Sequence, residues 1–354
     1  MSRFLSIMVY EEILYWLREN NEEKLKELWE KADLVRRQFV GDEVYLRGLI
    51  EISNYCSKNC SYCGIRVSNK SLKRYRMSKD EIIDTALLAK ELGYGTVVLQ
   101  SGEDPGFLPE EIAYIIGDIK SKAGLAVTLS LGEQSRENLK LWKRAGADRY
   151  LLKFETSDER LFKKLHRGPS AKKLAGRISQ ILYMKELGYE VGSGIIIGLP
   201  YQTYESIAKD IVLFKEMDLD MIGIGPYVPH PLTPLGKIYS SHKESVSKSV
   251  PNTPEMTIKV VALTRLACPE SNIPATTALA TIGGVEARKL CLLRGANIIM
   301  PNITPLKYRV YYDIYPGKTC SIKNIQDTHE DIIQLIESIG RIPGVGRGDR
   351  VRQN

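Results

Sequence analysis

Short apolar runs of strand length alternate along most of the chain with amphipathic stretches of helix length. Eight runs have strand character: 45–53, 96–100, 125–130, 149–154, 191–197, 221–225, 272–276 and 296–300. Between and after them, apolar residues recur at helical spacing over 78–92, 109–122, 135–145, 171–187, 203–217, 285–294 and 328–339. This alternation predicts an α/β protein, specifically a (βα)8 TIM-type barrel.

The first 40 residues depart from this alternation. Apolar residues recur at helical spacing from residue 6 to about 37, and no strand precedes them. We therefore expect an N-terminal helical extension over 1–40 and a barrel domain over 41–354. The polar connection 230–254, rich in Lys and Ser, predicts an excursion outside the barrel and no domain boundary.

Composition restricts the classes of protein to consider. The chain is 43% hydrophobic and 26% charged, which is ordinary for a globular protein with a large core. Its net charge of +7 comes from cations interleaved with acids, as over 21–37. We find no basic stripe with interleaved aromatics, so we expect no nucleic-acid partner. No run approaches the roughly 18 apolar residues of a membrane span, and no signal peptide is visible. These features predict a cytoplasmic protein.

Three of the six cysteines lie within eight residues, at Cys56, Cys60 and Cys63. In a reducing compartment such a cluster indicates metal binding before disulfides. Thiolates select zinc or iron–sulfur clusters, but a structural zinc site needs four ligands, and no Cys or His follows closely. Three ligands leave one iron of a 4Fe-4S cluster open. The scattered Cys268, Cys291 and Cys320 are interpreted as small buried hydrophobic residues.

Polar residues follow almost every predicted strand. Active sites of (βα)8 barrels gather at the carboxyl ends of the strands, which makes these positions candidates. They are the cysteine loop, 100–104, Thr128, Ser130, Lys153, Glu155, 226–230, Thr276, Thr277 and 300–302.

The spacing Cys56-x3-Cys60-x2-Cys63 on this loop resembles the signature of the radical S-adenosylmethionine (SAM) superfamily. The resemblance implies one 4Fe-4S cluster on these cysteines, SAM on the open iron, and reductive cleavage to a 5′-deoxyadenosyl radical. Tyr62 fills the aromatic position where the family's backbone meets the adenine. Gly102 and Glu103 lie in a segment that resembles the motif holding the SAM amino group, and a carboxylate suits an ammonium. Taken alone, that segment is explained as well by a capping turn.

A narrower resemblance extends over nearly the whole chain to the FeFe-hydrogenase maturases of the HydE type, in the group that includes biotin synthase and methylornithine synthase. The stretches that carry it are 72–77, 98–105, 127–133, 223–226, 229–231, 272–277, 295–302 and 315–318. It implies that Ser130, Glu155 and Arg177 contact SAM. It further implies that Lys153, Thr276 and Thr277 line a substrate or anion pocket, with Thr128 on the adjoining strand and Met300 and Tyr312 at cavity positions.

Simpler interpretations of these residues remain open. Glu155 could form a salt bridge with Lys153 or Arg149, Arg177 could be an exposed helix residue, and the two threonines could cap the next turn. The chain also departs from the family, with Lys153-Phe154-Glu155 where relatives often have Arg-His-Glu. Cys320 has no close companions, so we expect no second cluster.

The resemblance implies a small-molecule or iron-complex substrate, with other hydrogenase maturases and an electron donor as partners. One alternative keeps the superfamily and makes the chain a mutase or sulfur-insertion enzyme of the methylornithine synthase or biotin synthase type. A biotin synthase would need a second cluster on strand cysteines, whereas Cys268 and Cys291 fall in predicted helices. The other alternative is a non-catalytic scaffold stabilised by zinc.

Overall fold

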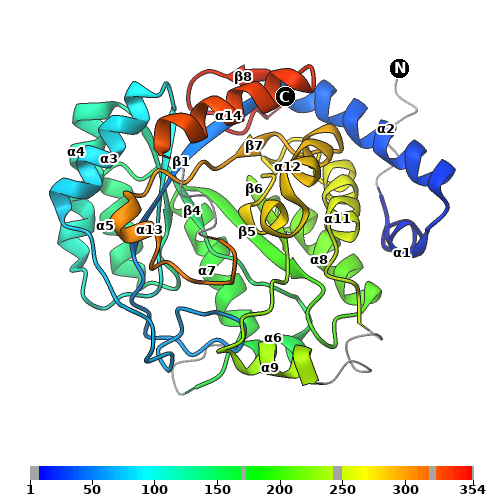
Figure 1. The fold of residues 1–354 in the computed structure, drawn as a ribbon, viewed down its shortest axis with the longest axis horizontal. Helices are drawn as coiled ribbons and strands as arrows, with labels where there is room; N and C mark the ends of the chain where they lie inside the picture. Colours follow the sequence, from blue (N-terminus) through cyan, green and yellow to red (C-terminus); the bar gives the residue numbers. More distant parts are fainter. Residues whose placement is uncertain (1–7, 169–172, 242–248, 319–323, 353–354) are drawn as a thin grey trace.

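Parallel strands form the centre of the molecule, and helices surround them (Figure 1). The structure is a computed structural model that describes residues 8–168, 173–241, 249–318 and 324–352. The strands run in the order β6-β5-β4-β3-β2-β1-β7, and β8 pairs with β1. Their bounds are β1 Glu43–Ser53, β2 Thr96–Ser101, β3 Ala126–Ser130, β4 Arg149–Leu151, β5 Glu190–Ile197, β6 Met221–Pro226, β7 Ile298–Ile299 and β8 Ile342–Gly344.

Between β6 and β7 the barrel is closed by residues 272–274, which do not form a regular strand. The predicted strand 272–276 forms only isolated parallel bridges, from Asn272 to Met221 and from Pro274 to Ile298. Pro274 has no N–H to donate, so a regular ladder cannot continue through it. The TIM-type prediction is confirmed, with the correction that this side of the ring is short and weakly paired. Strand β8 was not predicted.

Seven helices match the predicted ones closely: α3 Lys79–Glu91, α4 Pro109–Ala123, α5 Arg136–Arg144, α7 Leu174–Glu186, α8 Tyr204–Glu216, α12 Thr277–Leu293 and α14 Ile325–Ser338. Ser78 and Glu81 form the capping box that starts α3. Helix α12 begins eight residues before the predicted start. Gly284, at φ 65°, kinks the helix. The kink interrupts the helical spacing of apolar residues, so the first half of α12 was not predicted.

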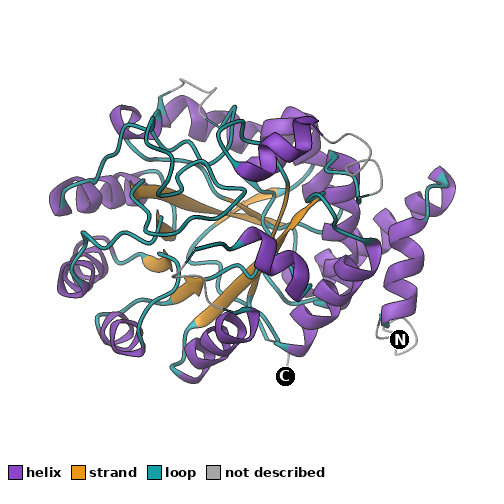
Figure 2. Ribbon diagram, turned by 90° about the horizontal axis from the view of Figure 1, so that it is seen from below, coloured by secondary structure: helices purple, strands orange, loops and turns teal. Residues whose placement is uncertain are grey.

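Within the described ranges, four helices were not predicted: α6 Glu159–Leu165, α9 Pro234–Ser241, α11 Pro254–Ala267 and α13 Leu306–Arg309. Helix α11 is buried almost all round, so it lacks the alternating polar face that reveals a surface helix. Helices α6, α9 and α13 are short, with at most eight residues each, which leaves little periodicity to detect. Seen from below in Figure 2, the helices ring the strands.

The N-terminal segment, expected to be a helical extension, forms two helices, α1 Tyr10–Arg18 and α2 Glu22–Val40. Helix α1 packs on α8 and α11, and α2 packs on α11, outside the ring of strands (Figure 1). Lys259 of α11 donates to the backbone carbonyls of Leu17 and Glu19, which satisfies the end of α1. Within the described ranges, no helix has the length and apolar character needed to cross a membrane.

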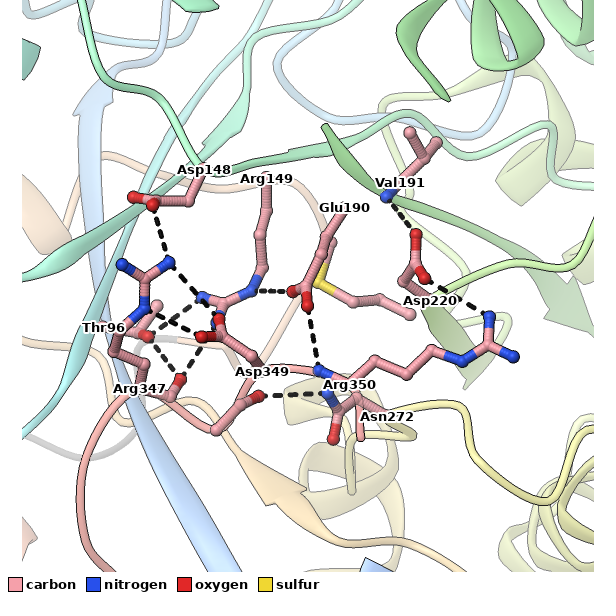
Figure 3. A network of polar contacts seen from close by, with 12 residues as sticks. Thr96, Asp148, Arg149, Glu190, Val191, Asp220, Asn272, Arg347, Asp349 and Arg350 are labelled. Atoms are coloured by element: carbon pink, nitrogen blue, oxygen red, sulfur yellow. Dashed lines mark hydrogen bonds and ion pairs between the residues drawn. The ribbon is translucent and has the colours of Figure 1, made fainter. Parts of the chain in front are cut away.

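The C-terminal tail crosses the amino-terminal ends of the strands and forms the floor of the barrel (Figure 3). The carbonyl of Arg347 accepts from Thr96 and from Arg149 Nη2, at 2.8 and 3.1 Å. The carbonyl of Gly348 accepts from Arg47 Nη2 at 2.8 Å. Arg47 and Arg149 are buried, so their guanidinium groups depend on carbonyls that the tail supplies.

Candidate functional site

A cavity of about 380 Å³ extends inside the barrel from Arg47 near the floor to the cysteine loop at the carboxyl ends of the strands. The residues to which the resemblance assigns a role all line it: Cys56, Cys60, Tyr62, Cys63, Gly102, Glu103, Thr128, Ser130, Lys153, Glu155, Arg177, Thr276, Thr277, Met300 and Tyr312. Of the wider strand-end candidates, Asp104, Pro229, His230, Pro301 and Asn302 do not line it. Residues that are distant in sequence therefore share one enclosed space.

The cysteine loop after β1 is folded around the guanidinium of Arg74. Its Nη1 donates to the carbonyls of Asn54 and Ile65, and its Nη2 donates to those of Arg66 and Asn69. Four carbonyls on one planar group hold both ends of the loop in a single shape. Arg74 therefore positions the cysteines without lining the cavity itself.

Gly102 allows the strand β2 end to approach the cysteine loop. A Cβ at this position would lie 2.3 Å from the carbonyl oxygen of Tyr55 and 2.6 Å from Cβ of Cys56. Ser57 N–H donates to the carbonyl of Glu103 at 2.9 Å, which joins the two segments. Any larger residue would displace the loop.

A chain of alternating charges runs along one side of the cavity. Lys58 Nζ lies 3.2 Å from Glu103 Oε2 and 3.3 Å from Glu133 Oε2. Arg177 Nε donates to Glu133 Oε1 at 2.9 Å. Burial raises the pKa of Glu103, while Lys58 and the backbone N–H of Glu133 oppose that rise. Arg177 is buried, so its interpretation as an exposed helix residue is wrong.

His166 extends this chain from the unpredicted helix α6. Arg177 Nη1 lies 3.0 Å from Nε2 of His166, whose Nδ1 lies 3.1 Å from the carbonyl of Phe162. Burial, and then the Arg177 charge, lower the pKa of His166 to about 3. The imidazole is therefore neutral, with its proton on Nδ1 and its Nε2 accepting from Arg177.

Glu155 sits at φ 67°, a conformation that a non-glycine residue rarely adopts. Its Oε1 accepts from the Tyr62 hydroxyl at 3.4 Å, and its Oε2 lies 3.5 Å from Lys153 Nζ. The expected salt bridge to Lys153 is thus present but long. Within the described part of the chain, Oε2 of Glu155 and Oγ1 of Thr128 are buried without a hydrogen-bond partner. Such atoms are costly unless a ligand or water completes them.

The substrate-side candidates are placed differently. Thr276 donates to the carbonyl of Ile224 at 3.1 Å and caps α12, so the capping interpretation holds for it. Thr277 begins α12, where backbone N–H groups favour an anion. The hydroxyl of Tyr312 accepts from Gln100 Nε2 at 3.2 Å. Met300 and Lys153 line the same cavity.

The three cysteines have the chemistry of metal ligands. Burial raises the pKa of all three thiols, that of Cys60 to about 12. Buried thiols of this kind ionise only when a strong positive charge such as a metal compensates them. Among the described residues, no group of three Cys, His, Asp or Glu side chains converges on one ion. A 4Fe-4S cluster does not require such convergence, because each cysteine binds a separate iron.

The residues present thus fit both expected groups, a cluster on the cysteines and a charged ligand beside them. Several residues were missed from the sequence. Arg47, Lys58, His166 and Lys318 line the cavity, Glu133 holds Arg177, and Glu51 forms an ion pair with Lys318. Glu133 follows β3, and Lys58 lies between the cysteines, so the strand-end rule could have found both. Cys320, expected to be alone, lies outside the described residues.

Comparison with known proteins identifies similar chains. A family model described as Radical SAM superfamily matches residues 50–214. The [FeFe] hydrogenase maturase subunit HydE of Thermotoga maritima is 49% identical over 327 residues, which cover 92% of this chain and 89% of that protein. The 3-methylornithine synthase of Methanosarcina acetivorans is 30% identical over 331 residues, which cover 92% and 86%.

Solved structures show the same architecture. The crystal structure of methylornithine synthase (PylB) superimposes with a TM-score of 0.79 at 26% identity, covering 95% of this chain and 94% of that one. The hydrogenase maturase HydG superimposes with a TM-score of 0.78 at 20% identity, covering 96% and 73%. The second likeness concerns the fold alone.

Proposed function

The chain belongs to the HydE family of the radical SAM superfamily, and we propose that it reductively cleaves SAM and acts in assembly of the di-iron subcluster of FeFe hydrogenase. One observation carries the proposal: Cys56, Cys60 and Cys63 line the same cavity as Glu103, Glu155 and Arg177. Three thiolates with an open iron require a chelating ligand nearby, and this cavity has the charges to bind one.

The cysteines would hold one 4Fe-4S cluster, which when bound supplies the electron that breaks a carbon–sulfur bond of SAM to give a 5′-deoxyadenosyl radical. Glu103, held by Lys58, faces the cavity as an acceptor for the SAM ammonium. Oε2 of Glu155, which has only the long contact to Lys153 and no hydrogen-bond partner among the described residues, suits a hydroxyl or ammonium donor. Arg177, oriented by Glu133 and His166, presents its remaining donors to a carboxylate.

The other side of the cavity would receive the substrate. Lys153 supplies a positive charge, and Thr277 together with the start of α12 adds donors, which suits an anionic iron complex or small molecule. The tail floor limits the entry of water from below, which protects a radical. We further propose a cytoplasmic location and action with other hydrogenase maturases and an electron donor.

The test is anaerobic reconstitution with iron and sulfide, followed by SAM and dithionite and chromatography of the products. We expect 5′-deoxyadenosine and methionine in equal amounts. The triple variant C56A/C60A/C63A should lose iron binding and cleavage while keeping the circular dichroism of the fold. The matched control C268A/C291A alters two buried cysteines that do not line the cavity and should retain both properties.

Two outcomes would favour the alternatives. A colourless protein that binds zinc and forms no product would support the scaffold. The methylornithine synthase likeness, at 30% identity, makes lysine the first competing substrate to assay. Cleavage of SAM that depends on lysine and yields a rearranged amino acid would replace the hydrogenase role while leaving the superfamily assignment intact.

A further inference from the structure

Two segments of the chain are purely cationic. Residues 54–74 and 160–177 together carry twelve Lys or Arg and no Asp or Glu. The whole chain has 50 basic and 43 acidic residues, so the remainder of the molecule is net acidic. The expectation that cations are interleaved with acids is therefore wrong for these two segments, which hold the excess positive charge.

The fold brings these two segments together at the cysteine loop. Ser61, next to Cys60, donates from its N–H to the carbonyl of Leu165 at 2.8 Å and from its hydroxyl to the carbonyl of Lys164 at 2.9 Å. A Cβ on Gly168 would lie 3.8 Å from Cβ of Asn59. The loop after β1 and helix α6 lie side by side in Figure 1.

The cations divide into two groups by burial. Arg66, Arg74 and Arg177 are wholly or largely buried and hold the loop and cavity wall through hydrogen bonds. Among the described residues, seven others are exposed: Lys70, Lys73, Arg160, Lys163, Lys164, Arg167 and Lys173. Four of these lie within two residues of Asn69, which bonds to Gly64, or of Leu165, which bonds to Ser61: Lys70, Lys163, Lys164 and Arg167. In the ranges that the structure describes, no carboxylate pairs with these four, which we call the loop patch. Arg66 Nε donates to Asn59, which also lies beside Gly168, so the neighbouring Arg167 is close to the loop.

We propose that the loop patch docks an acidic one-electron carrier protein that reduces the cluster on Cys56, Cys60 and Cys63. The carrier loses one electron and the cluster gains it, with no proton or group transferred. This inference rests on the proposed function. The patch residues lie on the cysteine loop and on the segment that Ser61 binds through the carbonyls of Lys164 and Leu165, which is where a reductant would approach the cluster. Exposed charges of one sign steer a partner of opposite sign.

The first experiment measures binding without turnover. The reconstituted protein is titrated with oxidised flavodoxin, an acidic carrier, by calorimetry at low and high salt. In K70E/K163E, the Kd should rise at least about tenfold at low salt, and added salt should erase most of the difference. The control K26E/K140E makes the same charge change at two exposed lysines, on α2 and α5, and should bind as the wild type does.

The second experiment measures 5′-deoxyadenosine formation with two reductants. With reduced flavodoxin, K70E/K163E should be slowed about tenfold, in line with lost electrostatic steering. With photoreduced 5-deazariboflavin, a small neutral reductant, its rate should match that of the wild type. A loss with both reductants would mean a structural role and would overturn the proposal.

Equal Kd values for flavodoxin in the wild type and in K70E/K163E would also overturn it. So would tighter binding of a short RNA than of flavodoxin, if K70E/K163E weakened that RNA binding. Absence of SAM cleavage by the wild type with every reductant would instead contradict the proposed function. In that case the calorimetry would still decide whether the patch docks an acidic carrier.

Discussion

Arg177 Nε donates to Glu133 Oε1 over 2.9 Å, and the two side chains are 10% and 2% exposed. Glu133 also lies 3.3 Å from Lys58 Nζ, so one carboxylate serves two cations of the cavity wall. The variant E133A leaves both without it and should lower the free energy of unfolding by about 3–5 kcal/mol, measured by urea denaturation. E133Q keeps an acceptor and should cost less.

The control for this prediction is D118A, which removes the surface pair with Lys122 on α4 and should cost less than about 0.5 kcal/mol. If E133A were as mild as D118A, the charge chain would contribute nothing to stability.

Arg74 should prove necessary for loading the cluster. R74K places one ammonium where a guanidinium donates to four carbonyls, so the cysteine loop loses its single shape. We expect at least a severalfold drop in iron and sulfide bound per chain after reconstitution, with the circular dichroism of the barrel retained. The neighbouring variant K73M removes an exposed cation and should load normally. Full loading of R74K would contradict the positioning role.

Deleting residues 346–354 should strongly destabilise the protein, because two buried guanidinium groups lose their tail acceptors: that of Arg47 and that of Arg149, which Figure 3 shows. Each such group left unsatisfied costs roughly 1–3 kcal/mol or more. If the truncated chain fails to fold, D349A offers a milder test, since it removes one carboxylate from Arg149. A thermal unfolding midpoint unchanged in both variants would show that the contacts of the tail with Arg47 and Arg149 do not stabilise the fold.

Asp210 should make stability depend on pH. Burial raises the pKa of its carboxyl to about 7, from an ordinary value of 3.8, although it accepts from Ser157 N–H at 2.6 Å. Between these two values the folded state holds a proton that the unfolded state releases, so the free energy of unfolding falls as pH rises through this window. D210N should therefore be more stable than the wild type near pH 8, by on the order of 1–4 kcal/mol.

Denaturation curves across this pH range would test the prediction, with the exposed D84N as control. The advantage of D210N should vanish toward pH 4, and a constant difference between D210N and the wild type at every pH would refute the titration of this carboxyl.

Much of the fold and of the candidate site could be predicted from local patterns. The period of apolar residues revealed most strands and helices, because side-chain burial repeats with the geometry of each element. The three cysteines lie within eight consecutive residues, so their spacing could be recognised from the sequence without knowledge of the fold. The strand-end rule then pointed to Thr128, Lys153 and Glu155, all of which line the cavity. Helix α11 was not predicted, because it is buried on nearly all sides and therefore lacks the polar face that reveals an amphipathic helix.

The sequence by itself determined the barrel class and most of the residues facing the cavity, including the three cysteines proposed as ligands, since each depends on neighbours within a few positions or on a known strand end. Only the tertiary structure decided that Arg177 is buried against Glu133 and His166, that the tail covers the floor, and that segments 54–74 and 160–177 merge into one basic patch. Charges far apart in the chain look evenly mixed until folding brings them together, because electrostatic interaction depends on distance in space.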